Sequence, residues 1–504
     1  MGDLTPHQPS RPLIWPDIMT DLQALLGSSA DEIYIVGGAV RDALLHRPLK
    51  DVDLATSADA MRLARQIANH FDGDFFPLDS ERDVGRALVD TPDGRLLFDV
   101  ARFRGDGLLA DLSDRDFTIN AMAVDLHADL ASLIDPLDGE GDIAVKRLRR
   151  CTPYALKNDP IRAMRAVRQS IQLGLRIDPE TLADIRAVSP LLAEVSPERV
   201  RDELFKMLAL PKPASALRVA DAAGLWEGVL PELQPLHGLQ LNALHLLDAW
   251  GHTLSVVESL SNILAVLDYN RSDNLTSSFS AGAMAVHLDR YRAQFRAHLN
   301  VEWPNERSHR ALLMLAALLH DIGKPLTAQQ DEAGSWRFFG HEAVGAKLAE
   351  ARANALRLSN AERQRLVTVV AHHNRPLWLQ DPSPRAIHRF WRETGEAGVD
   401  ICLLAMADYL GSIGTRINQK EWLILVSRIR LLIEAYFDQH DKLVVPAILV
   451  DGHQLMQTFA LKPGRIIGEL LDLIREAQVA GEVTSAEDAL EFARNYLEQT
   501  RPSG

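Results

Sequence analysis

Two acidic segments near the start of the chain have the spacing of a metal site. Asp51 and Asp53 stand two residues apart in the segment DVDL, so on a β-strand their side chains share one face. Asp99, in the segment LLFDV, could add a third carboxylate from a neighbouring strand. Carboxylates grouped in this way suit two Mg²⁺ ions, although an isolated Asp-x-Asp is most often a solvated turn. The three aspartates are candidate catalytic residues, with Asp51 and Asp53 as the Mg²⁺ ligands.

A pair of glycines precedes these carboxylates. Gly37 and Gly38 follow the β-branched segment EIYIV and come just before an expected helix. They would let the backbone approach a phosphate closely, while the helix N-terminus offers free N–H groups. Arg41 stands where a guanidinium could assist. A Gly-Gly pair after a strand is usually only a turn, but its combination with the acidic segment favours a nucleotide phosphate site.

A second set of potential ligands lies in the later part of the chain. Histidines and aspartates there interrupt several apolar helices, and burying each of them without a partner would be costly. A single histidine on an apolar helix is more often a hydrogen-bonded core residue, whereas a metal would give the whole set one shared partner. A mixed imidazole and carboxylate set suits Mn²⁺, Fe²⁺, Ni²⁺ or Co²⁺. The candidate ligands are His252, His320, Asp321, His341, Asp408 and one of the adjacent pair His372 and His373, for which we take His372.

Hydrophobic patterning predicts the elements that must position these residues. From about residue 153 onward, apolar residues recur at three- and four-residue spacing, which indicates an almost wholly helical chain. The part before it alternates between strand and helix patterns, so the predicted fold class is α+β, a small α/β head followed by a helical neck, body and tail. Strands are expected at 32–36, 51–54 and 96–103, and helices at 16–26, 39–45 and 59–70.

The composition is that of a folded globular protein. The 504 residues include 54 Lys and Arg against 69 Asp and Glu, a net charge of −15, and 47% are hydrophobic. This length suggests about three or four structural units. No apolar run is long enough for a membrane helix, the two cysteines make no disulfide framework and the start lacks a secretory signal, so we expect a cytoplasmic protein with no membrane partner. The acidic balance does not exclude RNA, because residues 146–168 carry eight Lys or Arg against one acid.

The segment GGAVRDALLHRPLKDVDLAT resembles the nucleotidyltransferase signature shared by CCA-adding tRNA nucleotidyltransferases and bacterial poly(A) polymerases. Four later segments agree in order: DRDFTINA at 114–121, DPLDG at 135–139, NDPIRAMR at 158–165 and SPER with a later Glu at 196–203. The resemblance covers roughly residues 31–235. It identifies the first half of the chain as similar to a template-independent RNA nucleotidyltransferase.

The resemblance implies a mechanism and a set of site residues. The 3′-hydroxyl of an RNA would attack the α-phosphate of CTP or ATP, and pyrophosphate would leave, with one metal lowering the pKa of the hydroxyl and the other stabilising the leaving oxygens. Asp159 and Arg162 would share a helix face and read the edge of the incoming base. The implied nucleotide-binding residues are Gly37, Gly38, Arg41, Arg115, Asp116, Asn120, Asp159, Arg162, Arg165 and Arg168.

Two departures from the family pattern bear on which nucleotides are added. Asn158 replaces a usual Glu, and Gln169-Ser170-Ile171 replaces a usual Phe-Ala-Ala. Only Gly105–Ser113 separates an expected strand from Asp114, where CCA-adding relatives commonly carry a longer flexible loop. The short segment resembles that of CC-adding enzymes. Addition of CMP, AMP or both to tRNA or another RNA 3′ end stays open, with CC addition alone and poly(A) synthesis as the alternatives.

The second half of the chain resembles the HD phosphohydrolase domain, whose motif order is H…HD…D. His252, His320, Asp321 and Asp408 match this order, and His341 with one of His372 and His373 matches further ligands of two-metal members. The resemblance implies metal-dependent attack of water on a phosphate ester, with Lys324 as a phosphate contact. A 2′,3′-cyclic or terminal phosphate on RNA would be a coherent substrate. A further alternative is a phosphohydrolase whose head only binds RNA.

The last part of the chain also resembles this family. The segments VDGHQLM at 450–456 and KPGRIIGE at 462–469 match a region that helps to hold RNA, although a helix turn punctuated by Pro and Gly has the same spacing. The predicted domains are an N-terminal extension and short helix at 1–30, a nucleotidyltransferase head at 31–150, a helical neck for base selection and RNA binding at 151–237, an HD domain at 238–440 and an RNA-binding tail at 441–504.

Overall fold

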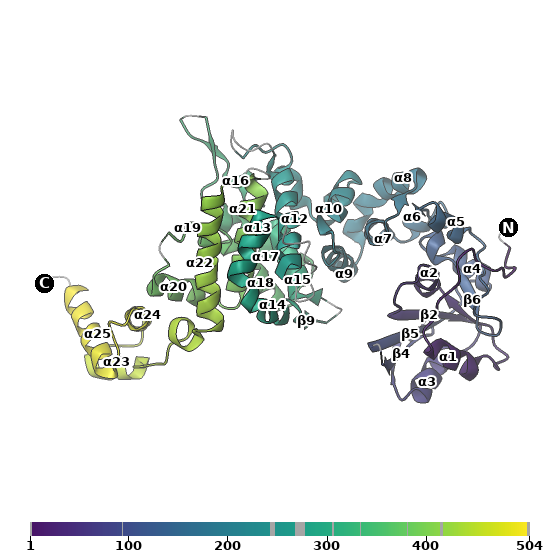
Figure 1. Ribbon diagram of the computed structural model, residues 1–504, viewed down its shortest axis with the longest axis horizontal. Helices are drawn as coiled ribbons and strands as arrows, with labels where there is room; N and C mark the ends of the chain where they lie inside the picture. Colours follow the sequence, from purple (N-terminus) through teal and green to yellow (C-terminus); the bar gives the residue numbers. More distant parts are fainter. Residues whose placement is uncertain are drawn as a thin grey trace. The chain divides into compact units, whose positions relative to one another are not determined.

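The computed structural model describes residues 3–92, 94–241, 247–267, 278–304, 307–332, 334–380, 382–413 and 417–500 (Figure 1). The chain forms two compact units, Met1–Val195 with Val219–Val229 and Ser196–Arg218 with Leu230–Gly504. The first carries a six-stranded sheet and the second is largely helical, which confirms the α+β fold class. Across the described ranges, every helix is too short or too polar to cross a membrane.

The sheet of the first unit places the three candidate acidic residues on two neighbouring strands. Its strand order is β3-β4-β5-β2-β1-β6, and only β2 and β5 run parallel. Sequence patterning predicted β1, β2 and β5, whereas β3, β4 and β6 were missed. The strands are β1 Ile33–Val36, β2 Asp51–Thr56, β3 Asp74–Asp79, β4 Val84–Thr91, β5 Gly94–Arg102 and β6 Ala123–Asp125.

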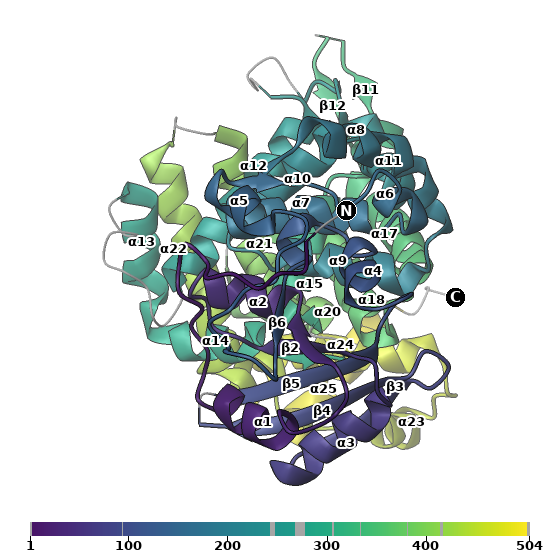
Figure 2. The same ribbon diagram turned by 90° about the vertical axis from the view of Figure 1, so that its right-hand side faces the viewer.

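Helices α1 (Ile18–Leu26) and α3 (Ala60–His70) lie along the same face of this sheet (Figure 2). The side chain of Asp59 caps α3 by accepting a hydrogen bond from the N–H of Arg62, at 2.8 Å. Leu63 and Ile67 of α3 are buried in one apolar core with Phe98 of β5. This core covers one face of β2 and β5 and leaves the alternate, polar side chains of these strands on the other face.

Short helices complete the first unit and lead away from the sheet. The two-residue strands β7 (Arg147–Leu148) and β8 (Arg176–Ile177) pair in parallel, so the region predicted as an all-helical neck contains one extended segment. Strand pairs this short lie below the length that side-chain periodicity can detect. The helices are α2 Gly38–Leu44, α4 Leu108–Ser113, α5 Gly139–Ala144, α6 Ala155–Asn158, α7 Arg162–Leu173, α8 Pro179–Val188 and α11 Trp226–Val229, and α10 Pro213–Ala222 crosses the division between the units.

The second unit packs its helices around α15 (His309–Leu319). Nearly every residue of α15 is buried, as expected for a helix surrounded by others. Helix α15 packs on α12 and α18, and α12 packs along α21. The other helices of this body are α9 Pro197–Leu208, α12 Ala249–Leu267, α13 Phe279–Leu288, α14 Arg292–Leu299, α16 Lys324–Thr327, α17 His341–Ala355, α18 Asn360–His372, α19 Arg375–Trp378, α20 Pro384–Thr394, α21 Ala397–Ile413 and α22 Gln419–Phe437.

Two small hairpins and a three-helix tail belong to the same unit. The hairpins are β9–β10 (Glu302–Trp303, Arg307–Ser308) and β11–β12 (Gln329–Gln330, Trp336–Arg337). The tail helices α23 (Gly452–Phe459), α24 (Arg465–Val479) and α25 (Ala486–Thr500) have an apolar core of their own. Glu476 of α24 pairs with Arg389 of α20 at 2.6 Å, which ties the tail to the body.

Candidate active sites

Three carboxylates meet on one face of the head sheet. Strands β2 and β5 are parallel neighbours, and their register places Asp53 directly beside Asp99. Asp51 lies on the same side of β2 as Asp53, since it is two residues away. Asp99 also receives two hydrogen bonds from Arg86 of β4, at 2.7 and 2.8 Å. The structure therefore brings the predicted catalytic aspartates together and adds Arg86, which was missed because β4 was not predicted.

Electrostatics at this site favour a bound cation. Burial raises the pKa of Asp53, and the neighbouring Asp99 and Asp51 raise it further, while Arg115 opposes the shift. A divalent cation would relieve the repulsion among carboxylates that the fold holds close together. Oxygen donors alone, with Asp51 exposed to solvent, are the donor set that Mg²⁺ accepts while it keeps several waters. The residues present fit Mg²⁺.

Gly37 is required where the backbone passes the carboxylates. Its φ is +77°, and a Cβ there would lie 2.6 Å from Nη1 of Arg115 and 3.2 Å from Oδ2 of Asp53. Any side chain would therefore clash with the arginine, and an L-residue would also be strained. The glycine lets Arg115 and Asp53 approach the turn that leads into α2.

Asp111 holds Arg115 in this position. Its Oδ2 accepts hydrogen bonds from Nε and Nη2 of Arg115 at 3.1 and 2.9 Å, and its Oδ1 accepts the N–H of Arg104 at 3.1 Å. The short segment Gly105–Ser113, which stands where relatives carry a longer loop, is largely the helix α4 that carries Asp111. The i, i+4 spacing of Asp111 and Arg115 was the sequence signal for this pair, and we overlooked it.

A buried polar network joins the other predicted nucleotide-binding residues. Asn120 accepts a hydrogen bond from Arg41 at 2.5 Å and donates to Asp116 at 2.9 Å and to Gln169 at 3.0 Å. Arg165 pairs with Asp116 at 2.8 Å. Burial alone would raise the pKa of Asp116, but Arg165 and the hydrogen bonds to the carboxylate lower it to about 2. The Gln169 that departs from the family pattern is thus a member of this network.

The pair predicted to read the base lies close together, but not as one helical face. Asp159 follows α6 in an extended conformation, and Arg162 is the first residue of α7. The two residues therefore do not share a helix face as predicted, although Nε of Arg162 lies 3.8 Å from Oδ2 of Asp159. The buried guanidinium of Arg162 donates to the carbonyls of Asp114 and Arg115, and Arg168 donates to Gln172 at 3.1 Å. Base reading by these side chains stays a prediction.

In the helical unit, five helices or helix ends place histidines and an aspartate around Asp321. Nε2 atoms of His252, His320 and His341 lie 3.3, 3.2 and 3.4 Å from its carboxylate oxygens, and Nε2 of His373 lies at 3.9 Å. Asp408 of α21 approaches His252 at 3.1 Å. Two metal-ready groups result, and Asp321 belongs to both: His252, His320 and Asp321, and Asp321, His341 and His373.

The backbone fixes which nitrogen each imidazole presents. Nδ1 of His320, His341 and His373 donates to the carbonyl of the residue three positions earlier, at 2.7, 2.8 and 2.8 Å. A carbonyl only accepts, so each Nε2 carries the lone pair that a metal requires. Among the described residues, the buried Nε2 atoms of His320 and His373 have no hydrogen-bond partner. A divalent metal would satisfy both, so the residues present fit one.

The structure corrects one predicted ligand. His372 is the last residue of α18, half-buried and outside both groups, whereas His373 is 1% exposed and points into the cluster. Consecutive residues of a helix point about 100° apart, so only one of the two can face Asp321. The sequence left this choice open, and His372 was the wrong one.

Charge balance in the cluster also favours a cation. Burial alone would lower the pKa of His252, but Asp321 and Asp408 raise it to about 9. Burial would raise the pKa of Asp408, yet the two imidazoles of His252 and His320 hold it well below its usual range. Lys324 pairs with Asp321 at 2.6 Å. Two buried carboxylates that raise the pKa of His252 and pair with Lys324 would also attract a metal cation.

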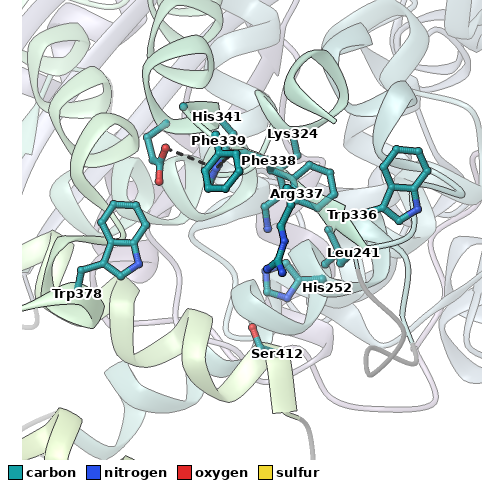
Figure 3. Close-up of a pocket in the computed structure, with 12 residues that line it drawn as sticks. Leu241, His252, Lys324, Trp336, Arg337, Phe338, Phe339, His341, Trp378 and Ser412 are labelled. Carbon is teal, nitrogen blue, oxygen red and sulfur yellow. Dashed lines mark hydrogen bonds and ion pairs between the residues drawn. The ribbon is translucent and has the colours of Figure 1, made fainter. Parts of the chain in front are cut away.

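A pocket of about 310 Å³ opens beside this cluster (Figure 3). Lys324, predicted as a phosphate contact, lies on its wall together with the candidate ligands His252 and His341. Aromatic residues form much of the remaining wall, which motif reading did not identify. The other lining residues are Leu241, Trp336, Arg337, Phe338, Phe339, Gly340, Glu342, Trp378 and Ser412.

Family models match four consecutive parts of the chain. Residues 33–149 match the poly(A) polymerase head domain, and residues 174–236 match the probable RNA- and SrmB-binding site of polymerase A. Residues 279–411 match the HD domain, and residues 437–493 match a putative tRNA nucleotidyltransferase domain 2. His252 precedes the HD match in sequence but lies within the same metal-ready group as His320 and Asp321.

Two relatives match almost end to end. An A-adding tRNA nucleotidyltransferase of Deinococcus radiodurans is 31% identical over 92% of this chain and 96% of that protein. This chain belongs to the tRNA nucleotidyltransferase family. It is a class II member with an HD domain. A CC-adding tRNA nucleotidyltransferase of Geobacter sulfurreducens is 33% identical over 93% of both proteins. A solved CCA-adding enzyme in complex with ATP shares the fold, with a TM-score of 0.61 and 18% identity over 96% of both chains.

Proposed function

We propose that the protein adds CMP, AMP or both to the 3′ end of tRNA by nucleotidyl transfer. The observation that carries this proposal is the group of Asp51, Asp53 and Asp99 on neighbouring parallel strands, beside the Gly37 turn and Arg115. The similar A-adding and CC-adding relatives support tRNA as the partner and ATP and CTP as the donors. A tRNA substrate also supports the cytoplasmic location.

Different side chains of the head position the metal and the triphosphate. Asp51 and Asp53 would hold Mg²⁺, which supplies charge for the triphosphate and lowers the pKa of the attacking 3′-hydroxyl. Arg115 contacts the triphosphate from its place beside Gly37, and Asp111 holds the guanidinium there. Arg86 orients Asp99 through two hydrogen bonds. The RNA oxygen forms a bond to the α-phosphorus while the bond to the pyrophosphate oxygen breaks.

The segment between β5 and Asp114 favours the CC-adding outcome. It is short, and its helix α4 is tied to Arg115 and to the backbone of Arg104 through Asp111. Such a segment has little freedom to rearrange between CTP and ATP selection. A CC-adding relative and an A-adding relative match this chain at similar sequence identity. The nucleotides that this protein adds must therefore be determined from its reaction products.

One assay tests the head. The protein is incubated with Mg²⁺ and labelled CTP or ATP, together with a tRNA that ends before the first C, one that ends in CC, or one that ends in CCA. CC addition predicts two CMP residues on the first tRNA and none on the others, while full CCA addition also extends the tRNA ending in CC. Long AMP tails would indicate poly(A) synthesis. D53N is the control, and incorporation that survives it overturns the proposal.

A second activity is favoured by the cluster around Asp321. We propose metal-dependent hydrolysis of a phosphate ester in the HD pocket, with a 2′,3′-cyclic or terminal phosphate of RNA as substrate. His252, His320, Asp321, His341, His373 and Asp408 would hold the metal, which supplies Lewis acidity and a nucleophilic water. Mn²⁺, Fe²⁺, Ni²⁺ or Co²⁺ suits this donor set. Lys324, paired with Asp321 at 2.6 Å, brings a cation to the phosphate side of the pocket.

Hydrolysis is tested with the purified protein and 2′,3′-cyclic AMP in the presence of Mn²⁺, Ni²⁺, Fe²⁺, Co²⁺ or Mg²⁺. The expected result is opening of the ring to a phosphate monoester by addition of one water, faster with the transition metals than with Mg²⁺. D321N should abolish it. If no metal supports release from this or a generic phosphodiester, the hydrolase proposal is overturned.

A further inference from the structure

The HD pocket combines groups that bind phosphate with groups that bind a flat ring. Lys324 and Arg337 bring positive charge to the wall that also holds His252 and His341. Four aromatic side chains, Trp336, Phe338, Phe339 and Trp378, line the same pocket. A site for inorganic phosphate or a small aliphatic ester needs only the charged groups. The aromatic wall therefore requires a ligand with an apolar, planar part.

Two of these aromatic side chains face solvent at the rim. Phe339 is 81% exposed and Trp378 is 65% exposed. Trp336 and Phe338 are half-buried, and the Phe338 ring lies 5.7 Å from Nζ of Lys324. Single exposed aromatic residues are common on protein surfaces, but here two of the most exposed ones lie on one pocket beside a metal-ready cluster. Figure 3 shows Phe339 between the Trp378 and Trp336 sides of the view.

The turn that carries Phe339 also orients a metal-ready histidine. Nδ1 of His341 donates to the carbonyl of Phe338 at 2.8 Å, and Gly340, with φ at +75°, makes the turn between them. Phe339 is thus held two residues from His341 by a hydrogen bond and a glycine-dependent conformation. The local backbone therefore fixes the position of Phe339 relative to the metal-ready cluster.

Trp378 is held to the same cluster from a different helix. It ends the short helix α19, five residues after His373. Arg428 of α22 pins this helix by donating to the carbonyls of Pro376 and Leu377, each at 2.9 Å. At its start, Asn374 donates to Glu342 at 3.0 Å, next to His341. Both rim aromatics are therefore positioned by the elements that position the metal-directed imidazoles.

We infer that Phe339 and Trp378 form a stacking subsite for the base of a nucleotide. The phosphate on the ribose of this nucleotide is bound by Lys324, Arg337 and the metal-ready cluster around Asp321. This inference rests on the proposed HD activity and defines its specificity. The ligand is a nucleotide with a phosphate on its ribose, either at an unpaired RNA 3′ end or free in solution. Stacking on aromatic faces accepts every base, so the subsite is selective for a base without being selective among bases. A pocket of about 310 Å³ has room for one such unit, at the small end of ligand sites.

The test measures binding rather than turnover. Adenosine 3′-phosphate and the corresponding ribose phosphate without a base are titrated into the protein, with the affinity read by calorimetry and by quenching of tryptophan fluorescence. The base should strengthen binding by about 5- to 100-fold. W378A and F339A should each remove this advantage, leaving the affinity for the abasic compound and the measured metal content unchanged. W378F should retain the tighter binding of the ligand with a base, because phenylalanine also stacks.

F279A is the matched control, because Phe279 is an exposed aromatic residue on α13 of the same unit, outside the pocket. Equal affinity for both ligands in the unsubstituted protein overturns the inference, as does an equal loss for both ligands in W378A and F339A. A 3′-phosphorylated trinucleotide distinguishes the two sources: tighter binding than the mononucleotide indicates an RNA end, and equal binding indicates a free nucleotide. Base-dependent binding without hydrolysis of any ester would overturn the HD activity and uphold the subsite.

Discussion

The two candidate sites of this protein differ in the type of their candidate metal ligands and in how deeply these are buried. The head gathers carboxylates alone on strands, with Asp51 exposed and Asp53 half-buried. The HD cluster gathers four imidazoles and two carboxylates, and His320, Asp321 and His373 are almost completely buried. An open oxygen site suits Mg²⁺ and its retained waters, whereas a buried imidazole site suits a transition metal. The donors and their exposure together indicate two separate chemistries.

The two sites also differ in what fixes their geometry. In the head, the parallel register of β2 and β5 places Asp53 beside Asp99, and Arg86 and Asp111 hold the surrounding side chains. In the HD cluster, hydrogen bonds from Nδ1 atoms to backbone carbonyls set each ring. A substitution on the open face of the sheet leaves the pairing of the strands intact. Removal of one member of the buried cluster leaves the polar groups of the other members without their partner.

The strongest test of this comparison is to inactivate each site separately. D53N should lower nucleotide incorporation by about 1,000-fold or more, because an Mg²⁺ ligand supplies several kcal/mol of charge stabilisation. D321N should do the same to phosphate-ester hydrolysis. Rates of both reactions are measured for both variants. Loss of both reactions in either variant would show that the sites are not independent.

The next test sharpens the assignment within the HD cluster. H373A should lower the affinity for a bound transition metal by more than about 100-fold, since even residues that only orient ligands contribute 10- to 100-fold. H372A is the matched control on the neighbouring position and should retain normal metal content. Metal content and affinity are measured by elemental analysis and competition with a chelator. A larger loss in H372A would reverse the assignment.

A smaller effect is expected for the buried network of the head. The folded-state pKa of Asp116 is about 2, below its ordinary value of 3.8. A lowered pKa stabilises the fold above the ordinary pKa, and this contribution is lost as pH falls through about 2. D116N should therefore reduce the free energy of unfolding of the head by about 2 kcal/mol at pH 7, and the difference should shrink between pH 4 and pH 2.

The measurement is the urea midpoint of the head transition at several pH values. D90N, at an exposed aspartate of β4, is the control and should leave the midpoint almost unchanged. A D116N difference that stays constant down to pH 2 would contradict the lowered pKa.

The smallest effect is expected for Asp111, which accepts hydrogen bonds from Arg115. D111N should raise the KM for the nucleoside triphosphate and lower kcat/KM by about tenfold, because a charge-assisted hydrogen bond pair is weakened. D114N is the matched control, since the carboxylate of Asp114 pairs with Arg104 at 3.6 Å and both side chains are exposed. Steady-state kinetics with CTP check both. Equal effects of the two substitutions would mean that Asp111 does not position Arg115.

Motif reading predicted the candidate ligands that the structure brings together at both sites, but it missed the residues that hold them. Asp51, Asp53, His320 and Asp321 carry recognisable spacings along the chain. Arg86 and Asn374 act across elements, and each has an ordinary sequence context. Residues of this kind become visible only when strand register and helix packing bring them to their partners.

The sequence by itself determined the order of the parts, the α+β class and the kind of donor atom at each site, because these depend on residue type and local periodicity. Tertiary structure alone decided that His373 rather than His372 faces Asp321 and that Phe339 and Trp378 share one rim. The physical reason is that side-chain direction depends on how elements pack in three dimensions, and neighbouring positions in a sequence carry no record of that packing.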